Sequence, residues 1–317
     1  MSMIDRAQGC LLGALIGDAA GATLEFLGRK PTEDDLDRAL AMTGGGVFRV
    51  APGQITDDGE LTLALAHALI DGEGAYDLNK VAARYKAWFD SEPFDIGGTT
   101  HSALSVRVQD VVSLGKAVTQ RALAHSMESK ANGALMRVAP LGIWAARQTV
   151  EEAVKAARAD ACLTHPNPSC QWANVAYVLA IRHLLIQGGD SSGAIAAARQ
   201  ALEVGLDESA GEVLGWLDDA CAGALPDCHP MAGFVRIAFT LAFHHLHVGS
   251  SYEEALRQVL SGGGDTDTNS CILGGLIGAR WGEASLPLHM REAVQRCDTQ
   301  KGRRRPCWLT YSSVKLP

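Results

Sequence analysis

The sequence predicts an all-α protein with a single domain, and three observations lead to this prediction. Most apolar residues recur at intervals of three and four, which is the spacing of a buried helix face. The segments with this spacing are rich in Ala and Leu, which are strong helix formers. No run of alternating β-branched residues is convincing as a strand, and no stretch between the helices is long enough to be an interdomain linker.

The helical spacing is clearest in six segments, residues 61–71, 78–89, 150–163, 174–186, 233–246 and 252–260. Residues 45–50, with the sequence GGVFRV, could form a short strand, but we expect a loop. We divide the chain into a domain of residues 1–300 and a basic and polar tail of residues 301–317. The charged residues of this tail are expected to be solvated, and we assign no function to them: Lys301, Arg303, Arg304 and Arg305.

Two further segments carry glycine at a helical spacing of four, at Gly9, Gly13, Gly17 and Gly21 and again at Gly274 and Gly278. Each glycine inside a helix costs about 0.5–1 kcal/mol relative to alanine. In return, glycines four residues apart form a bare ridge along which another backbone can approach. The pattern predicts two tightly crossed helices at the centre of the domain. Asp18 lies on the first of them, and its buried carboxylate needs either hydrogen-bond donors or a metal ion.

Charge and cysteine content exclude several classes of function. A net charge of −8 does not favour nucleic acid or an anionic membrane surface as a partner. The apolar N-terminal stretch is too short to span a bilayer, and no secretory n-region precedes it. Eight scattered cysteines without a C-x-x-C pair indicate a reduced, cytoplasmic protein. Cys221, Cys228 and His229 do not have the spacing of zinc ligands.

Acidic residues and threonines gather at the starts of two helices. Thr56, Asp57 and Asp58 precede one apolar segment, and residues 265–268, with the sequence DTDT, precede another. Threonine or aspartate at a helix start is explained by capping, but capping alone does not require four aspartates and two hydroxyls. An EF-hand calcium loop is excluded, because its sixth and twelfth positions would be Ser270 and Leu276.

A site for two metal ions explains the acidic residues better than capping or calcium does. Two divalent ions about 4 Å apart repel each other by roughly 17 kcal/mol at an effective dielectric constant of 20. About four carboxylates are therefore needed to neutralise the pair, and the two helix starts supply four. Oxygen ligands favour Mg²⁺ or Mn²⁺ over zinc. This interpretation requires the two helix starts to meet in space.

Five segments, in this order, resemble the ADP-ribosylglycohydrolase family: GDAAGATLEF, MTGGGVFRVAPGQITDDGE, ANGALMRVAP, LTH and GGGDTDT. They extend from about residue 9 to residue 282, and the resemblance looks closest to the bacterial dinitrogenase-reductase-activating branch. It implies one compact orthogonal helical domain with a site for two Mg²⁺ or Mn²⁺ ions. It also implies hydrolysis of the N-glycosidic bond between ADP-ribose and a protein arginine.

The resemblance implies roles for individual residues as well. The metal ligands would be Thr56, Asp57, Asp58, Asp265, Asp267 and Thr268. The catalytic residues would be Glu25, Asp58 and Asp267, with Glu25 polarising a water molecule or the departing group. The substrate-binding residues would be Asp95, Gly97, Gly98, Asn132, Gly133, His165 and Phe234. Phe234 matches an aromatic residue that lies against adenine, although a core phenylalanine fits this position equally well.

Two residues depart from the family pattern. Gly59 stands where the family has a hydroxyl residue, and Gly98 stands where the related branch has asparagine. The expected partners are an ADP-ribosylated protein substrate and an ADP-ribosyltransferase. Other readings remain open: an immunity protein that binds such a transferase, a structural protein that reuses the fold, or a hydrolase of ADP-ribose linked to serine, nucleic acid or a small molecule. The modified target, the choice of ion and the oligomeric state are left open by the sequence.

Overall fold

The prediction of an all-α protein is confirmed by a computed structural model that describes residues 1–107, 112–205 and 207–314. Across these residues there is no β-strand, and only two isolated β-bridges occur, Gly45 with Val50 and Ala131 with Phe234. The segment 45–50 is thus a loop closed by one bridge, as expected. The helices are α1 (Met3–Gly21), α2 (Glu33–Leu40), α3 (Asp57–Asp71), α4 (Leu78–Asp90), α5 (Gly98–Leu104), α6 (Leu114–Ser126), α7 (Ala139–Ala145), α8 (Val150–Cys162), α9 (Pro168–Ile186), α10 (Ser191–Val204), α11 (Glu208–Ala222), α12 (Val235–Val248), α13 (Tyr252–Ser261), α14 (Thr266–Trp281) and α15 (Leu288–Gln295), with short 3-10 turns η2 (Glu283–Ser285), η3 (Thr299–Lys301), η4 (Cys307–Leu309) and η5 (Tyr311–Ser313).

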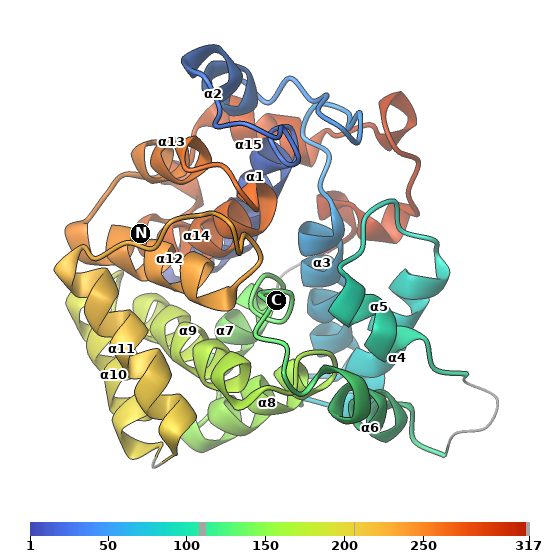
Figure 1. Ribbon diagram of the computed structural model, residues 1–317, viewed down its shortest axis with the longest axis vertical. Helices are drawn as coiled ribbons and strands as arrows, with labels where there is room; N and C mark the ends of the chain where they lie inside the picture. The colour runs from blue at the N-terminus through green and yellow to red at the C-terminus, as the bar shows by residue number, and fades with distance from the viewer. Residues whose placement is uncertain (108–111, 206, 315–317) are drawn as a thin grey trace.

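The helices form three neighbouring groups around a common apolar core (Figure 1). Helices α8 to α11 lie at the lower left of the view, α3 to α6 lie at the right, and α2, α13 and α15 lie at the top. Helix α1 and helix α14, from opposite ends of the chain, run side by side between these groups. No helix among the described residues has the length and apolar character needed to cross a membrane.

The six helices expected from apolar spacing are all present. They correspond to α3, α4, α8, α9, α12 and α13, and the largest difference is at α9, which begins six residues earlier, at Pro168. Asn167 caps this helix, because its side-chain oxygen accepts a hydrogen bond from the backbone N–H of Ser169. Helices α2, α5, α6, α7, α10, α11 and α15 were not expected. In α10 and α11, glycines at 193, 211 and 215 weaken the helical pattern, yet each helix begins with an aspartate cap and buries one apolar face.

The two glycine-rich helices, α1 and α14, cross as closely as the sequence predicts. A Cβ atom placed on Gly13 would overlap the carbonyl oxygen of Gly274, and one on Gly17 would overlap the carbonyl of Ser270. At the end of α1, the Thr266 hydroxyl donates a hydrogen bond of 2.8 Å to the carbonyl oxygen of Gly21. The C-terminal end of α1 therefore lies directly against the N-terminal end of α14, where the second acidic cluster begins.

The segment that follows α15 packs onto the body of the protein. Leu309 is buried there, and the side chain of Arg305 is only 4% exposed. The basic run, to which the sequence assigns no function, thus contributes one residue to the interior. The last three residues of the predicted tail, 315–317, lie outside the described residues.

Candidate active site

Asp18 of α1 is the point where three helices meet. Its carboxylate accepts hydrogen bonds from the backbone N–H of Thr56 (3.0 Å to each oxygen), from the Thr56 hydroxyl (2.7 Å) and from the N–H of Gly59 (2.7 Å). Thr56 is the N-cap residue of α3, but its own side chain makes no capping bond. The free N–H groups at the start of α3 are therefore satisfied by a carboxylate from another helix. This contact fixes the first acidic cluster against α1.

The two acidic helix starts meet in space. Single carboxylate oxygens of Asp18, Asp58 and Asp267 lie within 4.8 Å of one another. A second group, formed by oxygens of Glu25, Asp265 and Asp267 within the same distance, shares Asp267 with the first. The close crossing of α1 and α14 places Asp18 beside Asp267, and the hydrogen bonds of Asp18 place Asp58 beside both. The interpretation as a metal site required the two acidic helix starts to meet in space, and they do.

These carboxylates carry strongly perturbed pKa values. Burial, followed by the charges of neighbouring acids, raises the pKa of Asp57, of Asp58 and of Asp267 well above the usual range. Burial also raises the pKa of Glu25 to about 8, with further contributions from the charges of Asp95 and Asp265. A bound cation would lower the cost of ionising so many neighbouring carboxylates.

Carboxylate oxygens without a hydrogen-bond donor also favour a bound cation at this cluster. Oδ1 of Asp58 and Oε2 of Glu25 are buried, and no described residue donates a hydrogen bond to either atom. Buried carboxylate oxygens without a donor are costly unless they coordinate a metal ion. All the groups involved are oxygens, which are the ligands of Mg²⁺ and Mn²⁺. The residues present therefore fit divalent cations of this kind.

A cavity of about 280 Å³ opens beside the carboxylates. Most of the residues predicted for the site line it: Glu25, Asp57, Asp95, Gly97, Gly98, Asn132, Gly133, His165, Asp265, Asp267 and Thr268. Three others do not. Thr56 and Asp58 are absent from the lining, and the Thr56 hydroxyl lies 3.4 Å from Oδ2 of Asp58. Phe234 is also absent from the lining, although its neighbour Gly233 contributes to it.

Phe234 and Asn132 are brought together by the bridge between residues 131 and 234. The N–H of Asn132 donates to the carbonyl oxygen of Gly233 over 3.0 Å, and Nδ2 of Asn132 donates to Oδ2 of Asp265 over 2.8 Å. Asn132 thereby orients one of the acids. The ring of Phe234 packs edge-on against Trp216 of α11, with ring centroids 5.7 Å apart. Its stacking against adenine remains a prediction from the resemblance.

The two departures from the family pattern have different surroundings. A Cβ atom on Gly59 would lie 2.5 Å from Oδ2 of Asp18 and 2.8 Å from the Cβ of Ile55. Glycine at this position is thus what allows Asp18 to approach the start of α3. A Cβ atom on Gly98 would meet nothing within 4 Å, so this glycine leaves space in the cavity.

A second cavity, of about 450 Å³, adjoins the first. Four residues line both of them: Glu25, Phe26, Gly233 and Asp265. The loop after α1 forms much of the shared border, and Phe26 in this loop is 64% exposed. Its ring packs edge-on against Phe48, at 5.8 Å between centroids. The site can therefore hold a ligand longer than either cavity.

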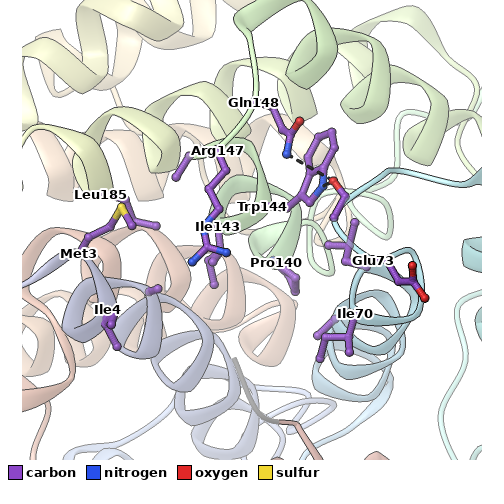
Figure 2. A pocket seen from close by; sticks show the side chains of 15 residues that line it. Met3, Ile4, Ile70, Glu73, Pro140, Ile143, Trp144, Arg147, Gln148 and Leu185 are labelled. Carbon is purple, nitrogen blue, oxygen red and sulfur yellow. Dashed lines mark hydrogen bonds between the residues drawn. The ribbon is translucent and has the colours of Figure 1, made fainter. Parts of the chain in front are cut away.

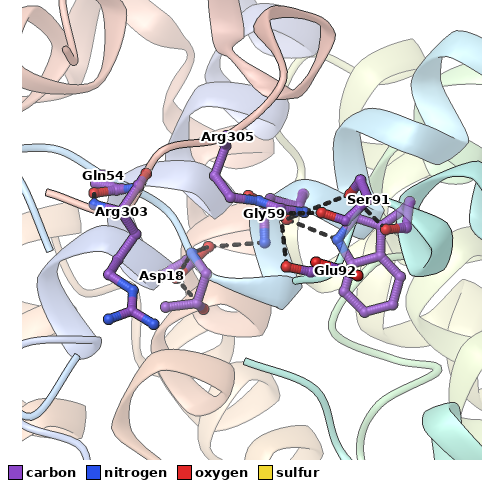
Figure 3. A network of polar contacts seen from close by, with 10 residues as sticks. Asp18, Gln54, Gly59, Ser91, Glu92, Arg303 and Arg305 are labelled. Atoms are coloured by element: carbon purple, nitrogen blue, oxygen red, sulfur yellow. Dashed lines mark hydrogen bonds and ion pairs between the residues drawn. The ribbon is translucent and has the colours of Figure 1, made fainter. Parts of the chain in front are cut away.

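Glu60 and Arg305 were not predicted from the sequence as part of the site, and Arg305 reaches the start of α3 beside Gly59 (Figure 3). Nε and Nη2 of Arg305 donate to the two carboxylate oxygens of Glu60 over 2.7 and 2.8 Å, and both side chains are almost fully buried. Nη1 of Arg305 donates to the carbonyl oxygen of Ser91 over 2.9 Å. Arg305 therefore joins the first turn of α3 to the loop that leads to Asp95. Asp18 was noticed in the sequence as a buried acid, but it was not assigned to the site.

A third cavity, of about 350 Å³, lies between α1, α3 and α7 (Figure 2). Its lining is mostly apolar and includes Ile4, Ile70, Pro140 and Ile143. It has no group of carboxylates like that beside α14. Of these three cavities, the 280 Å³ cavity is the one that brings polar and acidic groups together, and we take it as the candidate active site.

The fold and this cavity define an all-α protein with a buried carboxylate cluster that fits divalent cations. Comparison with known proteins then gives the family, because the ADP-ribosylglycohydrolase profile matches residues 1–309. The chain belongs to the ADP-ribosylglycohydrolase family, an enzyme family, and the resemblance noted in the sequence is confirmed.

Relatives and a solved structure agree with this assignment. The chain is 32% identical to a protein of Acanthamoeba polyphaga mimivirus named as an ADP-ribosyl glycohydrolase, covering 92% of this chain and 91% of the relative. It is 27% identical to the ADP-ribosyl-[dinitrogen reductase] glycohydrolase of Rhodospirillum rubrum, covering 90% and 89%. It is also 27% identical to the ADP-ribosylarginine hydrolase Tri1 of Pseudomonas putida, covering 92% and 74%. A solved structure, an ADP-ribosylglycohydrolase-related protein complex, matches with a TM-score of 0.72 at 27% identity, covering 91% and 92%.

Proposed function

We propose that this protein is a metal-dependent hydrolase that removes ADP-ribose from protein arginine side chains. The observation that carries the proposal is that Asp267, which lines the cavity, belongs to two groups of neighbouring carboxylates. Two of the relatives support the reaction, since their names specify ADP-ribosylarginine and ADP-ribosylated dinitrogen reductase as substrates.

The ligands that we assign to two Mg²⁺ or Mn²⁺ ions come from both helix starts: Thr56, Asp57, Asp58, Asp265, Asp267 and Thr268. Asp267 would be the ligand common to both carboxylate groups, because it belongs to each of them. When bound, ions of this kind would supply Lewis acidity to an attacking water and help to orient hydroxyl groups of the ribose. Asp18 acts through the protein instead, by holding the first turn of α3 in place.

The cavity residues have separate roles in this proposal. Glu25 lies on the border between the two adjoining cavities, where it can polarise a water molecule or the departing group. Gly97 and Gly98 present backbone rather than side chains, so the diphosphate of ADP-ribose can approach their N–H groups. Asn132, Gly133 and His165 also line the cavity and would contact the rest of the nucleotide sugar.

Charge favours arginine over serine as the carrier of ADP-ribose. Glu25 and Asp265 are lining residues of both cavities, so a group passing from one cavity to the other meets two carboxylates. A guanidinium carries positive charge and forms paired hydrogen bonds with carboxylates, whereas a serine oxygen does neither. The scattered, unpaired cysteines also support a reducing, cytoplasmic setting for the enzyme.

The test uses two peptides that differ only in the linkage, one with ADP-ribosylarginine and one with ADP-ribosylserine. Each is incubated with the full chain and Mg²⁺ or Mn²⁺, and free ADP-ribose is measured over time. We expect release from the arginine peptide to be faster by about tenfold or more, the factor that about 1.4 kcal/mol of differential binding provides. Faster release from the serine peptide would contradict the arginine assignment, and no release from either would contradict the enzymatic one.

A further inference from the structure

Arg137 is a fully buried arginine close to the cavity, and the proposed reaction gives it no role. Its Nε lies 3.3 Å from Oδ2 of Asp160, and its Nη2 donates to the carbonyl oxygen of Asp160 over 3.0 Å. The hydroxyl of Tyr85 donates to the other oxygen of the same carboxylate over 2.7 Å. The guanidinium is therefore held rigidly from one side. Its remaining nitrogen, Nη1, points to two residues next to the cavity.

Nη1 of Arg137 contacts Gly133, which lines the cavity, and Thr164, which precedes the cavity residue His165. It donates to the hydroxyl oxygen of Thr164 over 2.8 Å and lies 3.3 Å from the carbonyl oxygen of Gly133. The same Thr164 hydroxyl lies 2.8 Å from Nδ1 of His165. All three side chains of this chain of contacts are buried.

The direction of these bonds follows from chemistry. Arginine can only donate, so one lone pair of the Thr164 oxygen is used, and its single proton remains available. Among the described residues, Nδ1 of His165 is the one acceptor within hydrogen-bond distance of that hydroxyl. If Nδ1 carried a proton instead, the Thr164 hydroxyl would be left buried without an acceptor, which is unfavourable. Nδ1 is therefore the acceptor, and the ring proton is on Nε2.

We propose that Arg137 and Thr164 are positioning residues that hold His165 as the neutral tautomer with its N–H at Nε2, directed at the bound ADP-ribose. This inference rests on the proposed function, which supplies the ligand. His165 then donates a hydrogen bond to a phosphate or ribose oxygen and does not act as a proton acceptor. A histidine in this state has a fixed donor and keeps it near neutral pH.

Two further observations support this assignment. A Cβ atom on Gly133 would lie 2.7 Å from Cε1 and 3.0 Å from Nε2 of His165, so the bare backbone at Gly133 leaves room for this edge of the ring in the cavity lining. Burial, and next the charge of Arg137, lowers the pKa of His165 to about 3, so the ring stays neutral near pH 7. Because Arg137 also approaches the carbonyl oxygen of Gly133, one guanidinium fixes both neighbours.

The tautomer can be measured directly in the ligand-free protein. The ring nitrogens of the ten histidines are labelled with ¹⁵N, and the His165 signals are identified by their loss in His165→Gln. Three proteins are compared between pH 5.5 and pH 8.5: wild type, Thr164→Val, which removes the hydroxyl at nearly constant shape, and Thr164→Ser, which restores it. We expect the Nε2–H tautomer at every pH in wild type and Thr164→Ser, and Nδ1–H or a mixture in Thr164→Val.

Wild type alone decides the assignment if Thr164→Val fails to fold. Protonation at Nδ1 in wild type, or titration of the ring in this pH range, would overturn the proposal. An unchanged tautomer in a folded Thr164→Val protein would overturn the role of Thr164.

A second measurement tests the consequence for binding. Free ADP-ribose is titrated into the same three proteins in the presence of Mg²⁺, and the dissociation constant is measured. We expect Thr164→Val to weaken binding by about tenfold, and Thr164→Ser to recover most of the loss, because one hydrogen bond is at stake. Equal affinity of Thr164→Val and wild type would show that the tautomer does not serve the ligand. Absence of binding in all three proteins would instead refute the proposed function, while the tautomer measured above would still stand.

Discussion

The carboxylate of Asp18 accepts hydrogen bonds from both the backbone N–H and the hydroxyl of Thr56, and the hydroxyl lies 2.7 Å from Oδ1. This contact joins α1, which also packs closely on α14, to the first turn of α3. It explains how two acidic segments more than two hundred residues apart in the sequence form one site. The predictions below begin with the residues that make the contact possible.

Replacement of Gly59 by alanine is expected to destabilise the protein by about 1–3 kcal/mol, because the added Cβ would lie 2.5 Å from Oδ2 of Asp18. Urea denaturation measures the change. The matched control is Gly98→Ala in the first turn of α5, where a Cβ meets nothing within 4 Å and the change should stay within about 0.5 kcal/mol. Equal effects of the two substitutions would show that Asp18 does not depend on the bare backbone at residue 59.

The crossing of α1 and α14 should be intolerant of any side chain at Gly13. A Cβ there would overlap the carbonyl oxygen of Gly274, so Gly13→Ala is expected to cost about 3 kcal/mol or more in the free energy of unfolding. Gly215→Ala in α11, at an exposed helical glycine with open space around it, should stabilise by about 0.5–1 kcal/mol. A neutral Gly13→Ala variant would contradict the close crossing.

The buried pair of Glu60 and Arg305 should contribute far more than an ion pair at the surface. Arg305→Met leaves the Glu60 carboxylate buried without its cation, which is expected to cost about 3–5 kcal/mol. Arg199→Met breaks the exposed pair with Asp218 and should cost less than about 1 kcal/mol. Both changes are measured by denaturant unfolding. A small effect of Arg305→Met would mean that the C-terminal segment does not hold the start of α3.

Acid should destabilise the protein through His245 of α12. Burial, with a further contribution from the charge of His244, lowers the pKa of His245 to about 4. An unfolded chain with an ordinary histidine pKa near 6.5 binds more protons below that pH, so stability falls as the pH drops from about 6.5 towards 4. Through this histidine, the free energy of unfolding falls by about 2 kcal/mol between pH 7.5 and pH 5.

His245→Asn tests this acid sensitivity. Its amide can take the place of Nδ1, which lies 3.0 Å from the Ser250 hydroxyl, but it does not titrate. The free energy of unfolding of the variant should therefore depend less on pH than that of the wild type. The matched control is His247→Asn, at an exposed position of the same helix, and it should keep the wild-type pH dependence. Identical pH profiles for His245→Asn and wild type would contradict the assignment.

Much of the fold follows from local sequence patterns, because helix spacing and glycine ridges depend only on near neighbours. Helices α3, α4, α8, α9, α12 and α13, and the crossing of the glycine-rich helices, were predictable for this reason. Helices α10 and α11 were not expected. Their glycines lower the local helical preference, and packing against α9 and α12 compensates for it.

The site was predictable where composition exceeded what capping requires, as at Asp57, Asp58, Asp265 and Asp267. The residues that hold the site in place were not predictable. The ion pair of Glu60 and Arg305 joins residues 245 positions apart, and no local pattern marks a basic residue of the last segment as buried. Asp18 likewise has a role that depends on where α3 begins in space, which periodicity does not reveal.

Release of ADP-ribose by the Asp267→Asn variant tests most directly whether the shared carboxylate is the basis of the reaction. Wild type, Asp267→Asn and the surface control Asp218→Asn are freed of metal with EDTA, supplied with increasing Mn²⁺, and given an ADP-ribosylarginine peptide. Wild type and Asp218→Asn should release ADP-ribose only when Mn²⁺ is returned. Asp267→Asn should be slower by about 100-fold or more at every Mn²⁺ concentration, because both carboxylate groups lose the same member. Release by Asp267→Asn at the wild-type rate, or metal-independent release by wild type, would contradict the proposed site.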